Sequence, residues 1–426
     1  MIMKKILLVF SCLAMFACES MVDTPDPSFE SKSNLRSIDE VKSIALEALQ
    51  KIPNKPSVKS TNTQIVDVCS IGLSKTKSIS SDPLMYSVNF SDSSGFVLVA
   101  ADSSKPALLA VVNSGNYSGE QTDCSAFNAY IDDLTAELSK SSVQQRSLIV
   151  PGFQSYETDT TTFTRQVAPH ITCNWHQNDP FNRYCVSDSG VISPAGCGPV
   201  AIAHAMSRYS YPTVVDLTFE GAPYDGITID WDICKGHNYN HGTCQVCEFN
   251  ALLLREIGER CETCYSYDGS SSPVSRIGDC LAQFGYSSQY HDGYEINSVI
   301  NSLNQGQTII MSGYRPDPDA RSGYSGHYWN VDGYIFNEET VTNYKVVSDS
   351  PLREYDGYKR TTSWYLYFEY GWRASTYDGY YIAYSRLQGE GWYFYEPVDE
   401  PVISMFQCPI GYTYWVEMYT NIHPNE

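Results

Sequence analysis

The stretch "SPAGCGPVAIAHAMSRYSYP" (193–212) passes from small, turn-forming residues into a cysteine and then into an alanine-rich apolar run. Because Pro199 is tolerated only in the first turn of a helix, the pattern predicts a buried helix with Cys197 at or just before its N-terminus. Backbone N–H groups and the helix dipole at such an end favour an anion and lower the pKa of a thiol. The same N–H groups stabilise the oxyanion of a tetrahedral intermediate. Cys197 is therefore a candidate nucleophile, and the alternative is a half-buried cysteine in a disulfide.

A nucleophilic thiol needs a base, and His327 has the most suitable context of the eight histidines. In "SGYSGHYWNVDGYIF" (322–336) the glycine before it leaves room for a substrate backbone, and the alternating residues predict a strand. A cysteine on a helix followed much later by a histidine on a strand is the order of papain-like enzymes. His204 shares the helix of Cys197 but lies two turns, ~10 Å, further on, so we expect a core or polar-contact histidine there. The others are expected in surface loops or turns: His170, His176, His237, His241, His291 and His423.

Composition sets the class of protein and of partner. The 426-residue chain is 42% hydrophobic and carries a formal charge of -21. Its length allows two or three domains with cores of their own. The negative charge repels nucleic acid and anionic membrane surfaces, so we expect neither as a partner.

The first residues, "MIMKKILLVFSCLAMFACES" (1–20), combine two lysines with a short apolar run and small residues, the pattern of a bacterial export signal. The run is too short for a permanent membrane helix. Its ending "MFAC" (15–18) resembles a lipobox, in which Cys18 becomes the lipidated first residue of the mature protein. We therefore expect an exported protein with a lipid anchor in the outer membrane or at the cell surface of a Gram-negative bacterium. Plain secretion is the alternative.

Beyond the signal, the sequence predicts a small unit, a linker and a larger unit. The small unit begins with an amphipathic helix at 37–52, continues with strands joined by a turn at 91–95, and ends with a second helix. The linker is rich in Gln, Ser, Thr and Arg, and such a stretch between folded units is where a protease cuts. In the larger unit helices precede aromatic-rich strands, as in an α+β protein. The expected divisions are a signal at 1–18, the small unit at 19–142, the linker at 143–166, the larger unit at 167–395 and a C-terminal extension at 396–426.

Six blocks of sequence together resemble the streptopain family of exported cysteine peptidases in their order and rough spacing. The blocks are WHQNDPFNRYC (175–185), AGCGPVAIAHAM (195–206), ITIDWDIC (227–234), YSYDGSSSPVSRIGDCLAQFGY (265–286), GHYWNVDGY (326–334) and YFEYGWRASTYDGYYIAY (367–384). The stretch YSVNFSDSSGFVLVAAD (86–102) is similar to that family's inhibitory propeptide. The resemblance implies a papain-like catalytic domain, with a helical part and an antiparallel sheet or barrel part. A small α+β propeptide domain would precede it.

The resemblance also implies roles for particular residues. Cys197 would be the nucleophile, and His327 its general base and later the acid that protonates the leaving amine. Gln177, which precedes the cysteine, would help to form the oxyanion hole. Trp372 matches the second tryptophan of the family's Asn-Trp-Gly-Trp block, which packs by the histidine.

The chain departs from the family pattern in that last block. It reads Glu369–Tyr370–Gly371–Trp372, so the asparagine and the first tryptophan are replaced. A carboxylate at Glu369 that reached His327 would favour the imidazolium ion, and the alternative is that it points to solvent. Asp332 fits the family pattern, and we expect it to pin a turn rather than to take part in chemistry.

Two cysteine pairs raise a metal site as an alternative. Cys244-x-x-Cys247 and Cys261-x-x-Cys264 have the spacing of a zinc ribbon. The residues between the pairs have helical periodicity, and a helix there would hold the pairs ~20 Å apart, beyond the reach of one metal ion. In an exported protein disulfides, some of them to Cys234 or Cys280, are the better interpretation. No metal and no cofactor is expected.

The sequence thus predicts an exported zymogen of a cysteine endopeptidase that hydrolyses protein or peptide substrates through an acyl-enzyme. Its own propeptide would be an intramolecular inhibitor. Two alternatives stay open: a non-catalytic surface lipoprotein that binds glycan or protein through some of its 33 tyrosines, and a papain-like transferase or deamidase. A binding protein has no need of the trio Cys197, His327 and Gln177.

Overall fold

The computed structural model divides the chain into two compact units, Met1–Asn34 and Leu35–Glu426. All described residues belong to the second unit. They are 35–52, 64–72, 82–140, 156–219, 222–236, 245–320, 322–346, 353–372, 376–391, 402–407, 412 and 414–425. The expected export signal and Cys18 lie outside the described residues.

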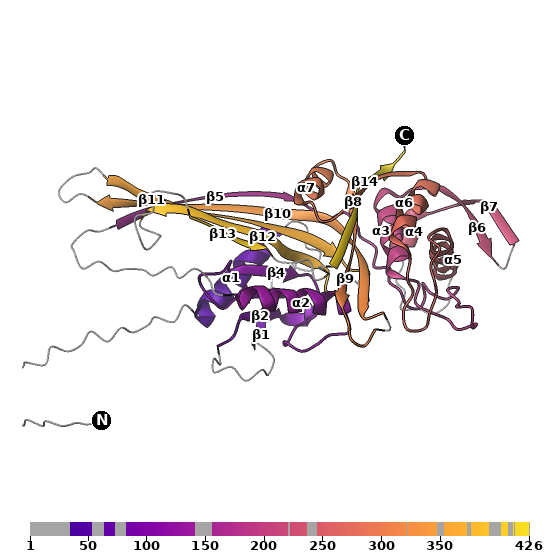
Figure 1. Ribbon diagram of the computed structural model, residues 1–426, viewed down its shortest axis with the longest axis horizontal. Helices are drawn as coiled ribbons and strands as arrows, with labels where there is room; N and C mark the ends of the chain where they lie inside the picture. Colours follow the sequence, from indigo (N-terminus) through magenta and orange to yellow (C-terminus); the bar gives the residue numbers. More distant parts are fainter. Residues whose placement is uncertain are drawn as a thin grey trace, which may run out of the picture. The chain divides into compact units, whose positions relative to one another are not determined.

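The described elements of the second unit begin as a mixture of helices and strands and end, after α7, in strands alone (Figure 1). The helices are α1 Ile38–Lys51, α2 Ser125–Leu138, α3 Cys197–Tyr209, α4 Trp231–Gly236, α5 Gln245–Arg260, α6 Val274–Gln283 and α7 Ile296–Asn304, with a short 3-10 turn at Ser91–Ser93. The first strands are β1 Ile65–Ile71, β2 Met85–Phe90, β3 Phe96–Ala100, β4 Leu108–Val112, β5 Tyr156–Val167, β6 Val214–Phe219 and β7 Ala222–Thr228. The later strands are β8 Tyr286–Asp292, β9 Thr308–Pro316, β10 Tyr324–Val346, β11 Arg353–Glu369, β12 Gly379–Gly391, β13 Val402–Gln407 and β14 Tyr414–Pro424.

The N-terminal elements follow the sequence prediction closely. Helix α1 begins after Ser37, whose side chain accepts a hydrogen bond from the N–H of Glu40 and so satisfies a free helix-end donor. Strands β2 and β3 flank the predicted turn, and β4 and α2 follow as expected. Strand β1 was not predicted from the sequence. It pairs with β2, but all of its residues except the last are exposed or only half-buried, so it lacks a clear apolar face.

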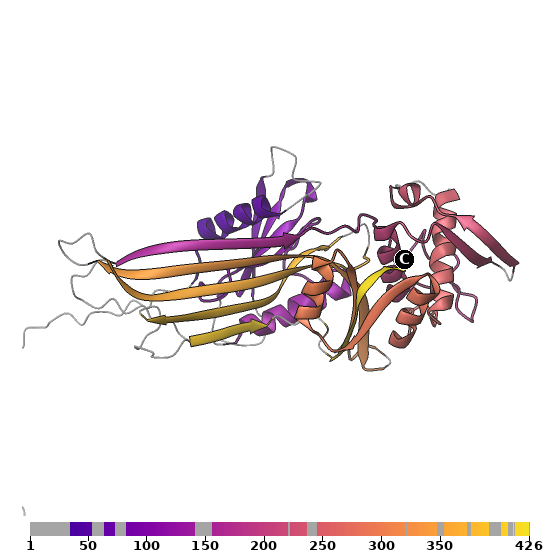
Figure 2. The same ribbon diagram turned by 90° about the horizontal axis from the view of Figure 1, so that it is seen from above.

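One antiparallel sheet of twelve strands runs through both the N-terminal elements and the later ones. The junction is the pairing of β4 with β12, where Gly379 lies opposite Val112 and Tyr381 opposite Ala110. Figure 2 shows β5, β10, β11, β12 and β13 side by side in this sheet. The described residues therefore form a mixed α+β fold with a large antiparallel sheet, which confirms the expected class.

The N-terminal strands are buried on both faces. Strands β2 and β3 are buried along their whole length. One face packs against α1 (Figure 1). The other shares a hydrophobic cluster with α2 and with β11 and β12, in which Phe127 stacks on Tyr377 at a centroid distance of 4.6 Å. The hydroxyl of Tyr130 on α2 also donates to the carbonyl oxygen of Ile382 on β12 at 3.2 Å. The N-terminal elements therefore share one core with β11 and β12.

The second half of the predicted linker is a strand. Residues Tyr156–Val167 form β5, which pairs with β10 from Lys345 to Tyr334. The threonines that make this segment look like a polar linker are β-branched, and β-branched residues favour extended backbone. A sheet partner more than 150 residues away then decides the structure.

The helical part contains the predicted buried helix. Helix α3 begins at Cys197, and every residue from Gly198 to Ser207 is buried. It packs with α5 and α6 in a second hydrophobic cluster. The helix predicted between the two cysteine pairs is confirmed as α5, whose last residue precedes Cys261.

The C-terminal tail belongs to the sheet. Strand β14 lies between β9 and β8 and pairs with both. His291 and His423 lie in β8 and β14, so the prediction of surface loops at these two positions was wrong. The two partners of β14 are β8 and β9, which the long strands β10 to β12 separate from it in sequence. Local sequence therefore could not show that these histidines lie in paired strands.

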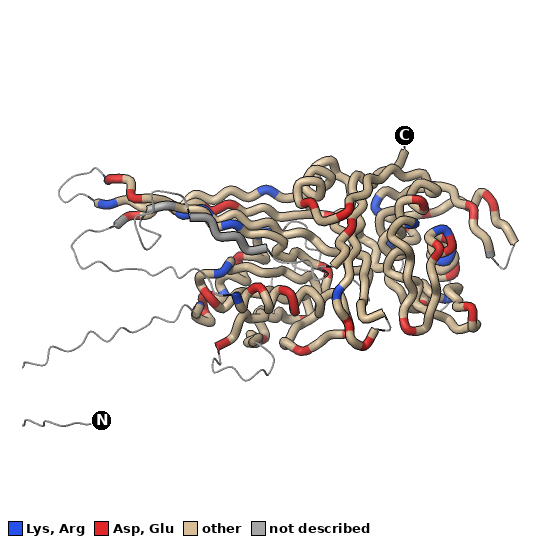
Figure 3. Tube along the Cα trace, viewed as in Figure 1, with Lys and Arg blue, Asp and Glu red and all other residues tan. Residues whose placement is uncertain are grey.

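Acidic and basic residues are interspersed along the described elements (Figure 3). No helix in the described part of the chain has the length and apolar character needed to cross a membrane. His, Cys, Asp and Glu side chains also form no group of three or more suited to a metal ion among the residues that the structure describes. Cys244, one of the zinc-ribbon cysteines, lies outside those residues.

Two of the buried cysteines are neighbours. The Cys261 and Cys280 thiols are fully buried and hydrogen-bond to each other, which raises the pKa of Cys261 well above its ordinary value. Because the two sulfur atoms already contact each other, we expect a mild thiol oxidant, such as oxidised glutathione, to link Cys261 and Cys280 in a disulfide. We do not expect it to link either of them to the buried Cys173. Peptide mapping after alkylation of the remaining thiols measures the linkage. A map that joins Cys261 to a different cysteine contradicts the expectation.

Candidate active site

A cavity of about 280 Å³ collects the residues that the sequence singles out. Its lining includes Cys197, His327, Gln177 and Trp372. These side chains come from the start of α3, from β10, from the loop before α3 and from the loop after β11. Residues that are up to almost 200 positions apart in the sequence therefore line the same cavity.

Cys197 is the first residue of α3 and is half-buried. The helix begins there because Gly196 has a φ of 95°, a conformation that ends the preceding loop and suits glycine. Backbone N–H groups of Tyr328, Cys197 and Gly198 donate to the sulfur and favour the thiolate. Burial outweighs them and raises the pKa of Cys197. The sequence-based expectation of a lowered pKa therefore fails in this state, because helix-end donors compete with loss of solvent.

His327 lies in β10 opposite Gly313 of β9 and is 4% exposed. Its Nε2–H donates to the carbonyl oxygen of Tyr370 at 3.0 Å. Two aromatic rings lie roughly parallel to the imidazole, that of Tyr412 at 5.9 Å and that of Trp329 at 6.4 Å between ring centroids. Burial lowers the pKa of His327 to about 4. Because Nε2 carries the hydrogen, the neutral ring keeps Nδ1 as its basic nitrogen.

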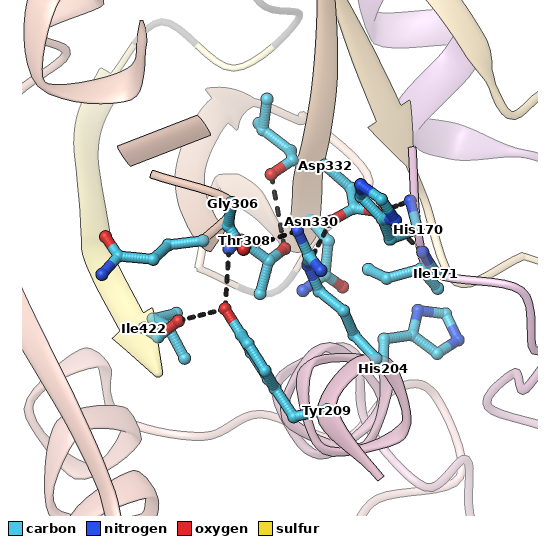
Figure 4. A network of polar contacts seen from close by, with 12 residues as sticks. His170, Ile171, His204, Tyr209, Gly306, Thr308, Asn330, Asp332 and Ile422 are labelled. Carbon is cyan, nitrogen blue, oxygen red and sulfur yellow. Dashed lines mark hydrogen bonds and ion pairs between the residues drawn. The ribbon is translucent and has the colours of Figure 1, made fainter. Parts of the chain in front are cut away.

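Polar contacts fix the cysteine helix against the histidine strand (Figure 4). The side-chain amide of Asn330 donates to the carbonyl oxygen of Ala201 at 3.0 Å. Two residues further along β10, Asp332 forms an ion pair of 2.9 Å with Arg208 of α3. Tyr209 adds a contact to β14, because its hydroxyl donates to the carbonyl oxygen of Ile422 at 2.5 Å.

Asp332 anchors a second segment as well. It is fully buried within β10, and its carboxylate accepts hydrogen bonds from the N–H groups of His170 and Ile171. Burial raises the pKa of Asp332, and Arg208 and the two N–H groups act against that rise. Asp332 therefore does not pin a turn, as the sequence suggested. It is a mid-strand anchor for α3 and for the chain that leads from β5 toward Gln177.

The loop before α3 places Gln177 beside the nucleophile candidate. The Gln177 carbonyl accepts from the N–H of Ala195 at 2.8 Å, which ties the two ends of this loop together. His176 lines the same cavity, with its ring edge-on to Phe181 at 4.9 Å. Sequence reasoning treated His176 as a surface histidine, and its position next to Gln177 was the signal that could have found it.

Glu369 occupies neither of the places considered from sequence. It is 3% exposed, so it does not point to solvent. It hydrogen-bonds to Asp378, and burial together with Asp378 raises the pKa of Glu369 well above its ordinary value. The acceptor for His327 is instead the backbone carbonyl of Tyr370, the next residue. A backbone acceptor works with any side chain, so the replaced family asparagine does not leave the imidazole without a partner.

Two residues from outside the elements that carry Cys197 and His327 lie near them. Ser125, the first residue of α2, is part of the lining of the cavity. Tyr412, which precedes β14, hydrogen-bonds to Ser125 and covers the His327 ring. Neither has a local sequence signal, since the contacts of both are with residues distant in sequence.

Comparison with known proteins gives the family. Residues 175–381 match the family model described as the peptidase C10 family. This region belongs to the peptidase C10 family. The match agrees with the resemblance to streptopain-like enzymes, and the chain is by class a cysteine peptidase. No curated protein matches the chain.

Solved structures extend the likeness beyond the C10 region. A fragment of Prevotella intermedia prointerpain A, carrying a cysteine-to-alanine mutation, has a TM-score of 0.51 and 16% identity. The match covers 86% of this chain and 100% of that one. Active wild-type Prevotella intermedia interpain A cysteine protease has a TM-score of 0.38 and 17% identity, over 60% of this chain and 94% of that one. The first likeness shows that the N-terminal elements and the C10 region share a fold with a proenzyme fragment.

The buried ion pair should dominate the stability of the C10 region. Replacing Asp332 by alanine leaves Arg208 and two N–H groups without their partner, so we expect a loss of about 3–5 kcal/mol. Chemical denaturation of the Cys197→Ala chain, with and without the second change, measures it. Asp319→Ala, an exposed position in the same part of the chain, is the matched control and should change stability by less than about 0.5 kcal/mol. Equal losses for the two variants would contradict the role given to Asp332.

Two buried histidines should make the folded chain sensitive to acid. Burial lowers the pKa of both His204 and His327 to about 4. A lowered folded-state pKa gives stability that is present above the unfolded value near 6.5 and is lost as pH falls toward 4. His204→Gln, which keeps a donor for the Trp175 carbonyl, should reduce this acid loss by up to about 3 kcal/mol. Denaturation curves of the Cys197→Ala chain between pH 4 and 8 test it, and parallel curves for the two chains would refute it.

Proposed function

We propose that the chain is the exported precursor of a cysteine endopeptidase in which Cys197 is the nucleophile and His327 the general base. The observation that carries this proposal is that Cys197 and His327 line one cavity. Cys197 begins a helix there, and the backbone N–H of Tyr328, the residue after His327, donates a hydrogen bond to its sulfur. The family match of residues 175–381 supports the reaction class. Cys18 is the proposed lipid attachment site, and plain secretion is the alternative route outside the cell.

In the proposed reaction, His327 Nδ1 takes the proton of the Cys197 thiol, and the thiolate attacks the carbonyl carbon of the scissile peptide bond. The carbonyl oxygen becomes an oxyanion, to which the backbone N–H of Cys197 and the side chain of Gln177 donate. Collapse of this intermediate breaks the C–N bond, and His327 gives its proton to the leaving amine. Water, deprotonated by His327, then hydrolyses the thioester and restores the thiol. Trp372 would shield the imidazole from bulk water.

The N-terminal elements act in this proposal as an intramolecular inhibitor. Ser125 lines the cavity together with Cys197 and His327. Burial raises the pKa of Cys197 and lowers the pKa of His327, so the neutral thiol and neutral imidazole are the favoured forms. A neutral pair is a poor nucleophile. The precursor is thus inactive for two reasons, exclusion of substrate and an unfavourable protonation state.

Activation is proposed to occur by cleavage in the first part of the predicted linker. Strand β5 begins at Tyr156 and pairs with β10, and paired backbone resists proteolysis. Arg165 lies within that pairing, opposite Phe336. The sites left for a protease lie between residues 143 and 155, where Arg146 is the basic residue.

A thiol probe tests nucleophile, activation and activity together. The purified full chain is incubated with an epoxide inhibitor of cysteine peptidases before and after maturation, and labelled residues and new N-termini are mapped by mass spectrometry. We expect slow labelling of Cys197 in the precursor, fast labelling after maturation, and casein hydrolysis that falls at least ~10³-fold in Cys197→Ala. Cys264→Ala, which removes an exposed thiol, is the control and should be labelled and active like the wild type.

Three outcomes would sink the proposal. One is a Cys197→Ala chain that matures and cleaves casein at the wild-type rate. Another is a matured wild type that ignores the epoxide. The third is transfer of the acyl group to an isotope-labelled amine without hydrolysis, which would make the protein a transferase.

A further inference from the structure

The cavity that Cys197 and His327 line has a carboxyl group in its wall. Among the described residues of this wall, Asp268 is the only acidic one, and none is a lysine or an arginine. The Asp268 side chain is also exposed. An exposed carboxyl group is ionised at neutral pH, so the wall carries a negative charge at this place.

Asp268 lies in a tight turn. The N–H of Gly269 donates to the carbonyl oxygen of Ser266 at 3.1 Å, which closes a four-residue turn with Asp268 at its third position. Gly269 has a φ of 138°, a conformation that suits glycine. At the base of the turn, Cys264 and Ser271 exchange backbone hydrogen bonds of 2.9 and 3.1 Å. The backbone that carries Asp268 therefore has a defined shape before any substrate binds.

The turn is attached to the loop that leads into α3. The hydroxyl of Ser270, which is 9% exposed, donates to the carbonyl oxygen of Pro194 at 2.6 Å. Pro194 precedes Cys197 by three residues, and both it and Ser270 line the cavity. This hydrogen bond therefore holds the turn, and Asp268 with it, at a fixed place relative to the candidate nucleophile.

The charge of Asp268 is left for a ligand. Within the described part of the chain, its side chain forms no ion pair and no hydrogen bond. The two arginines nearest to it in sequence are paired with other carboxylates. Arg260 contacts Glu256 at 2.8 Å, and Arg276 contacts Glu262 at 2.9 Å.

A substrate side chain that contacts Asp268 must belong to a residue near the scissile bond. Asp268 and Cys197 line the same cavity of about 280 Å³. An extended polypeptide advances only ~3.3 Å per residue, so a side chain in this cavity lies within about three residues of the carbonyl group under attack.

We propose that Asp268 is a specificity-determining residue that selects polypeptides with a cationic side chain within about three residues of the scissile bond. The inference rests on the proposed function and names its class of substrate. Arginine should be preferred to lysine, because its planar guanidinium gives a carboxylate two parallel hydrogen bonds. The formal charge of -21 attracts the same substrates from a distance. Arg146, in the segment proposed to be cut, belongs to this class.

Matched peptides and peptidyl epoxides measure the selection. Each is acetylated, so that no free α-amine supplies a charge, and carries arginine, citrulline or glutamate at one of three positions on either side of the reactive group. Citrulline has the shape of arginine without its charge. In the matured chain at low ionic strength, we measure kcat/KM for the peptides and the rate at which the epoxides label Cys197. At one position arginine should react about 10-fold faster than citrulline, and glutamate more slowly than citrulline.

Three variants separate the charge of Asp268 from the shape of its turn. Asp268→Asn, which also suits a turn, should reduce the ratio of arginine to citrulline rates below about 2 without slowing the citrulline probe. Asp268→Lys should reverse the preference, so that glutamate reacts faster than arginine. Asp188→Asn removes an exposed carboxyl group that is not part of the cavity wall and should keep the wild-type ratio. A purely structural role of Asp268 would slow all probes alike.

The outcomes separate this inference from the proposed function. Equal rates for arginine and citrulline at every position would overturn the inference alone, and so would a ratio that Asp268→Asn leaves unchanged. Failure of every probe to label Cys197 would refute the proposed function and this inference with it. Because labelling requires only a reactive thiol, the selection is measured even if the acyl group passes to an amine instead of water.

Discussion

The buried ion pair between Arg208 and Asp332 is the constraint on which the candidate site depends. It joins the helix that begins with Cys197 to the strand that contains His327, two elements that are far apart in the sequence. Removing charges from water costs several kcal/mol per ion, so loss of either partner would leave an uncompensated buried charge. The hydrogen bond from Asn330 to the carbonyl oxygen of Ala201 is a second contact between the same helix and strand. Together the two contacts fix the distance between α3 and β10 at two positions along the helix.

The N-terminal elements are joined to the catalytic sheet as one structure. Strand β4 continues the sheet at β12, and α2 shares the cluster that lies under β11 and β12. A bound inhibitor could be held by a few surface contacts, but here a sheet edge and a core are shared. The proposed cut between residues 143 and 155 would therefore leave most of this contact intact, and separation of the two parts would expose apolar surface as well as strand edges.

The sequence is informative where a pattern is local and silent where a partner is distant. Helix α3, its cysteine at the first position and the strand of His327 could be predicted, because glycine, proline and alternation act within a few residues. Strand β5 could not, because threonine-rich sequence suits a linker as well as an edge strand until β10 pairs with it. The lowered thiol pKa was inferred from helix-end donors alone, since the burial of Cys197 has no local signal. Glu369 was misplaced for the same reason, because its partner Asp378 lies beyond a turn.

Burial is the common cause of the unusual protonation states. The loss of solvent that raises the pKa of Cys197 lowers the pKa of His327 and raises the pKa of Glu369. Each group is driven to its neutral form, whatever the sign of its charge. Departure of the N-terminal elements would rehydrate the cavity and the β4–β12 junction together. In the proposed function, the thiol and imidazole would then be free to form their ion pair. In the proposed function, the protonation states of Cys197 and His327 are therefore coupled to the interface with the N-terminal elements.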